Sequence, residues 1–386
     1  MGAERLRRLP PYLFAQIERK IAEKRAAGID VISLGIGDPD TPTPALVVEA
    51  LREHAARPDT HRYPSNRGRD SFRQAVAAFC ERRFGVTLDP ETEVIPALGA
   101  KEAIANLNLA FLDPGDIALA SDPGYPVYTS GPLFAGATAV ALPLLPELDF
   151  QPDLDAIPAD VLSRARLMFL NYPNNPTGAV IEDDFFSRVV DLARAHDIVV
   201  VHDNAYSEIT YDGYRAPSFL ETPGAKDVGI EVFSLSKTYN MTGWRSGAVV
   251  GNPELVSLYW QLKTNMDSGM FEVIQEASAA ALSSDQSSVA EVCAIYQRRR
   301  DRLVAALREI GLEVAPPKGT IYLWARVPEG ETSASFTEKV LEEAAVVISP
   351  GSAYGASGEG FVRMSLTLPD DRLDEAADRI ARLVNG

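Results

Sequence analysis

Short apolar runs rich in β-branched residues alternate with helical patterns through the middle of the chain, and this alternation constrains the fold most. Strands are predicted at 93–98, 117–120, 167–170, 198–201, 231–234 and 248–250. Gly99 ends the first run, and 100–111 follows as a helix with Ile104, Leu107, Leu109 and Phe111 on its buried face. Strands that alternate with helices are typical of βαβ units. The predicted fold is therefore α/β, a large domain whose mostly parallel sheet is flanked by helices.

The pattern changes after Asn252, where long helical stretches precede strands at 320–327 and 345–348 and a closing helix at 371–384. A helix at 12–27 ends at Gly28 and is expected to pack with these elements. A chain of 386 residues also exceeds the length at which one core stops growing. We predict that 1–40 packs with a smaller α+β domain at 286–386, and that 41–285 forms the large domain.

Composition narrows the choice of partners and compartment. The formal charge of −17, from 54 acidic and 37 basic residues, disfavours nucleic acid. The basic run at 298–302 is interpreted as a solvated helix face. Cys80 and Cys293 lack the spacing of a disulfide framework or a metal site. Without an apolar run of about 20 residues or a signal peptide, we predict a cytoplasmic protein that contacts no membrane.

Ligands of open α/β sheets bind beyond the carboxyl ends of the strands, and polar residues gather at these positions. They are Gly99-Ala100-Lys101, Asp122 to Tyr125, Asn174 to Gly178, Asp203 with Tyr206, and Ser234 to Arg245. A helix N-terminus followed by a lysine is a credible phosphate seat. A carboxylate at the mouth of a buried strand needs a partner, and a helix cap or salt bridge is as good an explanation as a ring N–H.

Lys237 lies in Ser234-Leu235-Ser236-Lys237, directly after an apolar strand, and Arg245 follows eight residues later. Most lysines are inert surface residues, but this context differs. A lysine beside a phosphate-binding arginine is placed to form an imine, and the neighbouring cation lowers its pKa. The sequence therefore indicates aldehyde chemistry.

From about Tyr12 onward, the chain resembles the fold-type I, class I/II aminotransferases. The resemblance rests on three motifs in the family's order and spacing: Asn175-Pro176-Thr177-Gly178, Asp203 with Tyr206, and Ser234-x-Ser236-Lys237 with Arg245. It implies pyridoxal 5'-phosphate as cofactor, bound by 41–285, and transfer of an amino group from an amino acid to a 2-oxo acid by a ping-pong mechanism. It also implies a homodimer.

The resemblance assigns roles to individual residues. Lys237 would hold the cofactor aldehyde as a Schiff base and move a proton, and Asp203 would keep the pyridine nitrogen protonated. Tyr206 and Asn175 would hydrogen-bond the phenolic oxygen, and Tyr125 would stack on the ring. The phosphate would be held by Gly99, Ala100, Lys101, Ser234 and Arg245.

The resemblance also implies roles for three residues that do not contact the cofactor ring. Tyr63 would reach the phosphate from the partner subunit. Arg363 would clamp the substrate α-carboxylate through two parallel bonds, and Asn175 would also bind the substrate. Gly37 would let the substrate approach the backbone closely.

Within the family, the runs 122–128, 171–178, 236–245 and 319–324 resemble the LL-diaminopimelate branch, which transfers to 2-oxoglutarate. After Tyr63 the chain reads Pro64-Ser65-Asn66-Arg67-Gly68, where the better-known form of that enzyme carries an acid that recognises the distal end of the substrate. The run 263–269 offers no second-carboxylate arginine, which disfavours aspartate. Alanine or broad-range transamination remains an alternative, and so does another reaction of the same cofactor, β-elimination or decarboxylation. A non-catalytic regulatory module is disfavoured, since no winged-helix segment precedes Tyr12.

Overall fold

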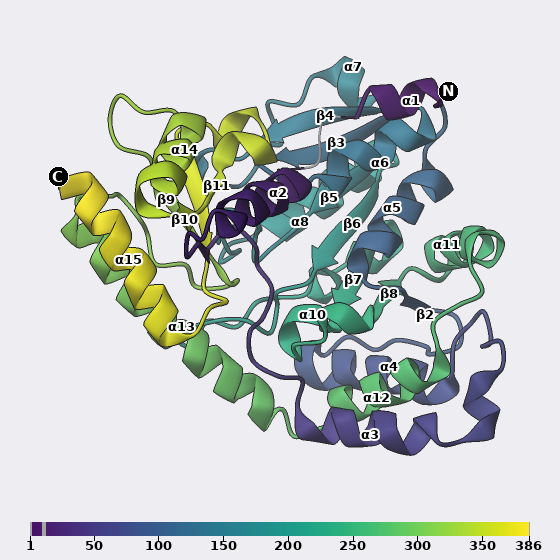
Figure 1. Cartoon of the computed structure of the whole chain (residues 1–386). Helices are drawn as coiled ribbons and strands as arrows, with labels where there is room; N and C mark the ends of the chain where they lie inside the picture. The colour runs from purple at the N-terminus through teal and green to yellow at the C-terminus, as the bar shows by residue number, and fades with distance from the viewer. Residues whose placement is uncertain (1, 10–12, 386) are drawn as a thin grey trace.

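A seven-stranded sheet crosses the molecule in the computed structural model, which describes residues 2–9 and 13–385 (Figure 1). Its strands, in spatial order, are β2 (Val94–Ala97), β8 (Gly247–Gly251), β7 (Gly229–Ser234), β6 (Val199–Asn204), β5 (Ala165–Leu170), β3 (Ile117–Asp122) and β4 (Thr138–Pro143). β8 runs antiparallel to both neighbours, and the other pairings are parallel. The prediction of a mostly parallel sheet is confirmed.

Helices cover both faces of this sheet, because successive strand residues point to opposite sides. Met168 of β5 belongs to a core cluster shared with helices α3 (Ala45–Ala55), α4 (Asp70–Phe84), α8 (Phe185–His196) and α12 (Glu272–Leu282). Its neighbours Leu167 and Phe169 belong to a second cluster, shared with α5 (Ala100–Phe111), α6 (Val127–Ala135) and α11 (Pro253–Met266). Helices thus flank the sheet on both faces, as expected for an α/β domain.

A second, three-stranded antiparallel sheet has the order β11 (Ser349–Pro350), β12 (Phe361–Ser365) and β9 (Tyr322–Arg326). Strand β1 (Ile32–Ser33) pairs with β10 (Val346–Val347). A third core cluster joins Ile32 and Leu34 to residues of β9, α13 (Ser287–Glu309), α14 (Ser333–Ala344) and α15 (Asp370–Asn385). The division into 1–40, 41–285 and 286–386 remains a prediction.

The remaining elements are short, apart from α2 (Leu13–Ala26), which matches the predicted helix at 12–27; Tyr12 itself lies outside the described residues. They are α1 (Glu4–Arg7), η1 (Pro58–His61), η2 (Pro146–Leu148), α7 (Ala159–Leu162), η3 (Phe219–Glu221), α9 (Ala225–Val228), α10 (Leu235–Thr238), η4 (Thr242–Trp244), η5 (Gly351–Tyr354) and η6 (Ala356–Gly358). Among the described residues, no helix combines the length and apolarity needed to cross a membrane.

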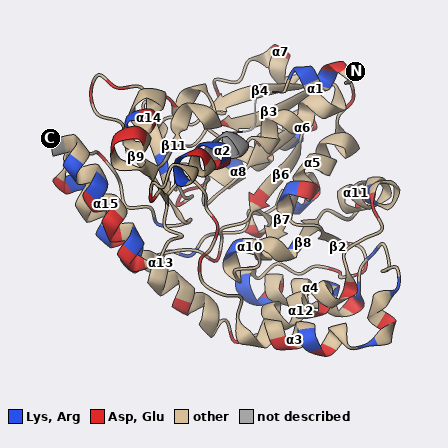
Figure 2. Ribbon diagram, viewed as in Figure 1, with Lys and Arg blue, Asp and Glu red and all other residues tan. Residues whose placement is uncertain are grey.

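The prediction of a solvated basic face at 298–302 was wrong for two of its arginines. Arg299 and Arg300 are 5% and 3% exposed. Arg299 pairs with Asp40 at 2.7 Å and Asp370 at 2.8 Å, and Arg300 pairs with Asp212 at 2.6 Å. Carboxylates from distant segments therefore allow the guanidinium groups to be buried on α13. Figure 2 shows both charge signs along the neighbouring helix α15.

Candidate active site

A cavity of about 330 Å³ lies at the carboxyl ends of β5, β6 and β7, where the sequence placed the chemistry. The predicted site residues that line it are Gly37, Ala100, Lys101, Tyr125, Asn175, Asp203, Tyr206, Ser234, Lys237, Arg245 and Arg363. Gly99 is not on the lining but lies against the Arg245 guanidinium. Tyr63 lies outside the cavity, and its side chain is 88% exposed.

Asp203 lies near the end of β6 with one satisfied and one unsatisfied oxygen. Its Oδ2 accepts a hydrogen bond from the Tyr128 hydroxyl at 2.8 Å. Its Oδ1 is buried and has no hydrogen-bond partner within the described part of the chain. Burial raises the pKa of Asp203 to about 6. A positively charged N–H donor in the cavity would satisfy Oδ1 and stabilise the carboxylate, so the site fits a protonated pyridine nitrogen.

Lys237 lies on the short helix α10, which follows β7 directly. Its Nζ donates a hydrogen bond to the backbone oxygen of Gly37, so the lysine reaches across the cavity to the segment after β1. Burial is the main cause that lowers the pKa of Lys237, and the charges of Arg363 and Arg245 lower it further. A lysine with a lowered pKa provides a neutral amine for attack on an aldehyde.

The N-terminus of α5 forms the opposite end of the cavity. Gly99 caps this 12-residue helix with φ +82°, and a Cβ there would overlap the Arg245 guanidinium. Arg245 Nη1 donates to the Thr242 oxygen at 2.8 Å, which fixes its position. The Lys101 ammonium lies 6.0 Å from the centre of the Tyr125 ring. The backbone N–H groups of a helix N-terminus and two cations make this end suitable for a phosphate.

Arg363 of β12 is 1% exposed and reaches the cavity from the three-stranded sheet. Its Nη1 donates to Asn175 Oδ1 at 2.9 Å and its Nη2 donates to the Gly35 oxygen at 2.8 Å. The guanidinium carbon also lies 4.0 Å from the centre of the Tyr322 ring. A guanidinium held in one plane is suited to bind a carboxylate with two bonds.

Other residues on the lining, among them Tyr128, Asn171 and Tyr322, were not assigned a role from the sequence. Asn171 follows β5, so the strand-end rule that selected Asn175 also points to it. Its side-chain oxygen accepts a hydrogen bond from the Asn175 backbone N–H at 2.8 Å, and its side-chain NH₂ donates to the backbone oxygen of Asp203 at 2.8 Å. Tyr322 accepts a hydrogen bond from the Tyr206 hydroxyl at 3.3 Å. No strand-end rule selects it, because it begins a strand of the other sheet.

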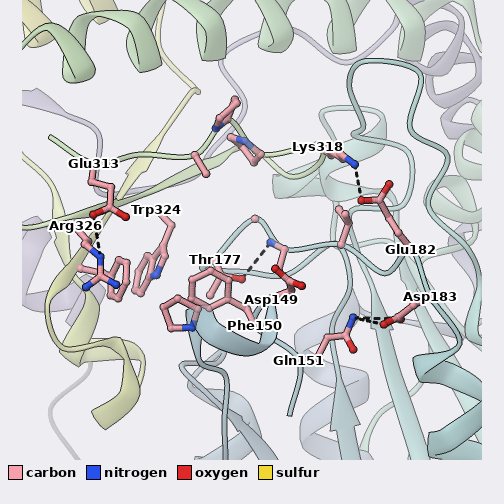
Figure 3. A pocket seen from close by; sticks show the side chains of 18 residues that line it. Asp149, Phe150, Gln151, Thr177, Glu182, Asp183, Glu313, Lys318, Trp324 and Arg326 are labelled. Atoms are coloured by element: carbon pink, nitrogen blue, oxygen red, sulfur yellow. Dashed lines mark hydrogen bonds and ion pairs between the residues drawn. The ribbon is translucent and has the colours of Figure 1, made fainter. Parts of the chain in front are cut away.

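A larger cleft of about 560 Å³ lies elsewhere on the molecule (Figure 3). Its walls carry the ion pairs Lys318–Glu182 at 2.5 Å and Arg326–Glu313 at 3.3 Å, together with the Trp324 ring. Both basic residues already have carboxylate partners. Thr177 and Gly178 of the Asn175-Pro176-Thr177-Gly178 motif border this cleft. None of the residues that were given a role in the site lines it, so the smaller cavity is the candidate active site.

Comparison with known proteins gives a consistent result. Residues 29–380 match the model of the family described as aminotransferase class I and II. An LL-diaminopimelate aminotransferase of Moorella thermoacetica is 54% identical over 382 residues, which cover 99% of this chain and 98% of the relative. The substrate-bound structure of BacF from Bacillus subtilis is 40% identical, with TM-score 0.95 and coverage of 99% and 98% of the two chains. The aspartate aminotransferase of Thermotoga maritima is 29% identical, with TM-score 0.92 and full coverage of both chains.

The family match spans nearly the whole chain, and it includes every element that lines the cavity. The unsatisfied oxygen of Asp203, the lowered pKa of Lys237 and the cationic end at α5 fit the cofactor that this family uses. The chain belongs to the class I and II aminotransferase family and is a pyridoxal-phosphate-dependent transaminase.

Proposed function

We propose that this aminotransferase moves an amino group from LL-diaminopimelate to 2-oxoglutarate. The observation that carries the proposal is the 54% identity, over nearly the full length of both chains, to a relative named LL-diaminopimelate aminotransferase. The runs 122–128, 171–178 and 236–245, which contribute to the cavity, resemble the same branch.

The proposed reaction divides its work among residues at fixed places. When bound, pyridoxal phosphate supplies a ring that withdraws electrons from the carbon that loses its proton. Asp203, through Oδ1, would keep the ring nitrogen protonated, and Tyr206 and Asn175 would hold the phenolic oxygen. Tyr125 would limit the movement of the ring on one face. The support is that all four side chains line one cavity.

Proton movement is proposed for Lys237, whose Nζ lies within the cavity wall beside the Gly37 oxygen. Its lowered pKa favours the neutral amine, which would take a proton from the substrate carbon and return it. Arg363 would bind the α-carboxylate that donor and acceptor share, with Asn175 fixing the guanidinium plane. A Cβ at Gly37 would overlap the Tyr322 hydroxyl. Glycine at this position would therefore let the substrate approach the backbone closely.

Phosphate binding is proposed for the cationic end of the cavity. The residues are Gly99, Ala100, Lys101, Ser234 and Arg245. Ser234 Oγ accepts a hydrogen bond from the Ser236 N–H at 3.2 Å, and Ser234 lines the cavity at the end of β7.

Alanine or broad-range transamination is the second candidate. The Pro64-Ser65-Asn66 segment favours it, because the branch's distal-end acid is missing there. The test is kcat/KM for LL-diaminopimelate, alanine, aspartate and glutamate as donors with one acceptor. A preference for LL-diaminopimelate of about tenfold or more, equivalent to about 1.4 kcal/mol, supports the proposal. Equal or higher values for alanine would replace it with the broad-range activity.

We also propose a homodimer in which Tyr63 enters the cavity of the partner. An 88% exposed tyrosine is consistent with this, and so is the exposure of Met266 and Phe271 near Gly269, where a Cβ would lie 3.2 Å from Pro64. Mixing inactive Tyr63→Ala and Lys237→Ala proteins tests the proposal. Shared sites predict that refolded mixtures regain activity, because one site of each mixed dimer carries neither change. No regain in mixtures shown to contain mixed dimers would refute it.

A cytoplasmic location is proposed as well, since Cys80 and Cys293 are both free thiols and suit a reducing compartment. Cell fractionation with an antibody to the chain tests this, and recovery outside the cytoplasmic fraction would refute it.

A further inference from the structure

A contact between the two sheets lies beside the candidate active site. Asp122 ends β3 of the seven-stranded sheet, and its Oδ1 accepts a hydrogen bond from the backbone N–H of Ser357 at 3.0 Å. Two residues later, the Gly124 N–H donates to the Tyr354 oxygen at 2.8 Å. Tyr354 and Ser357 belong to the segment that joins β11 to β12 of the three-stranded sheet. We name these two hydrogen bonds the sheet-bridging contact.

The backbone between its two bonds fits the carboxylate closely. Gly355 has φ +141°, a conformation that side chains rarely adopt, and a Cβ there would overlap Asp122 Oδ1. The turn therefore approaches the carboxylate as near as a glycine permits. Any side chain at Gly355 would push Asp122 and the turn apart.

Tyr354, whose backbone oxygen takes part in the sheet-bridging contact, has its ring against Arg363. The ring is 5% exposed, and its centre lies 4.8 Å from the guanidinium carbon of Arg363. It packs edge-on against Trp324 at 6.3 Å. A ring beneath the plane of a guanidinium restricts its tilt and attracts its charge. The position of Tyr354 thus bears on the orientation of Arg363.

The loop that follows Asp122 also contributes to the wall of the cavity. Tyr125 follows Gly124 directly and lines the cavity where the cofactor ring is proposed to lie. The segment from Asp122 to Tyr125 therefore adjoins that wall, and through Tyr354 it supports Arg363. Trp324, against which Tyr354 packs, also borders the larger cleft (Figure 3).

We propose that Asp122 is a positioning residue for the carboxylate clamp, because it holds the turn that keeps Tyr354 against the guanidinium of Arg363. The inference rests on the proposed role of Arg363. It assigns Asp122 an effect on the binding of every substrate with an α-carboxylate, donor or acceptor. Cofactor binding and the proton steps at Lys237 do not depend on it.

The experiment compares Asp122→Ala and Asp122→Asn in the holoenzyme, since asparagine keeps an oxygen that can accept the Ser357 bond. The control is Asp191→Ala, which removes an exposed carboxylate on α8. Calorimetry measures the Kd of glutarate, a dicarboxylate without a reacting group, and steady-state kinetics gives KM and kcat. Gly355→Ala disturbs the same contact while leaving the carboxylate in place.

Asp122→Ala and Gly355→Ala should weaken glutarate and raise both KM values by about tenfold, the equivalent of about one hydrogen bond to a charged group. Asp122→Asn and the control should stay within about twofold of the original protein. The visible spectrum of the bound cofactor should not change, and kcat should change less than KM. If Asp122→Ala fails to fold, Gly355→Ala alone decides the outcome.

Arg363→Lys separates this inference from the proposed function. If Arg363→Lys weakens glutarate while Asp122→Ala and Gly355→Ala do not, the positioning role is refuted and the clamp stands. Equal weakening by Asp122→Ala and Asp122→Asn would also refute it, because the accepting oxygen would then be irrelevant. If Arg363→Lys leaves glutarate binding unchanged, the proposed clamp itself is wrong.

Discussion

The cofactor-free protein should carry an energetic penalty at Asp203 that the substitution Asp203→Asn removes. Asp203 is 6% exposed, and its Oδ1 has no partner among the described residues. Ionisation in this place is unfavourable, so its pKa rises from the ordinary value of 3.8 to about 6. An asparagine stays neutral at every pH and can still accept the Tyr128 bond through its own oxygen.

The sign of the effect follows from the order in which the two states lose a proton. Below pH 3.8 the carboxyl is protonated in both the native and the unfolded chain, and the penalty is absent. Between pH 3.8 and about 6 the unfolded chain ionises first, so the free energy of unfolding falls as pH rises. At about 1.4 kcal/mol for each pH unit, the loss is about 3 kcal/mol, and above pH 6 it stays constant.

Urea unfolding of the cofactor-free proteins between pH 4.5 and 8, followed by circular dichroism, measures this difference. Relative to Asp203→Asn, the original protein should lose about 2 kcal/mol between pH 4.5 and 8, and most of this loss should come below pH 6.5. Asp191→Asn, an exposed control on α8, should follow the original protein. Added cofactor should remove the loss, because a cation then faces Oδ1. Parallel curves for the original protein and Asp203→Asn would refute the reasoning.

Three further predictions concern the remaining parts of the site and its support. Lys237→Ala should abolish the visible absorbance of the lysine-bound cofactor and lower kcat by at least about a hundredfold in steady-state assays; near-normal turnover would contradict its role. Gly99→Ala places a Cβ at φ +82° against the Arg245 guanidinium, so cofactor titration should show about tenfold weaker binding, whereas unchanged affinity would dismiss this phosphate seat. Glu231→Ala removes the partner that binds His202 at 2.6 Å and the Phe219 N–H at 2.7 Å, and urea unfolding should show a loss of about 3 kcal/mol, which a loss below 1 kcal/mol would contradict.

Much of the sheet could be predicted from the sequence because its inner strands are buried on both faces. β5 contains the apolar run Leu167 to Leu170 and β6 begins with Val199 to Val201, and such runs are detected from the sequence alone. The strand β4 was missed. It lies at the edge of the sheet, and only Leu142 of its six residues is buried, so its sequence carries a weaker signal. Leu109 was wrongly assigned to the core side of α5, since it is 39% exposed.

The meeting of residues from separate strands could be predicted in the same way, since the carboxyl ends of parallel strands share one edge. This rule brought together Asp203, Ser234 and Asn175, and all three line one cavity. It says nothing about the second sheet, which contributes Tyr322 to the cavity. Its contribution depends on how the sheets pack, and that packing involves contacts such as Asp122 to Ser357, 235 residues apart. The burial of Arg299 was missed for the same reason, because Asp40 lies far away in sequence.

The most direct test of the proposed function is a half-reaction with the cofactor-loaded protein and LL-diaminopimelate, without any acceptor. Transamination predicts that one equivalent of donor converts the bound cofactor to its amine form, seen as loss of the visible absorbance, with one equivalent of oxo acid produced. Addition of 2-oxoglutarate should then restore the absorbance and yield glutamate. Release of ammonia or carbon dioxide, or an unchanged spectrum with LL-diaminopimelate beside full conversion with alanine, would contradict the account.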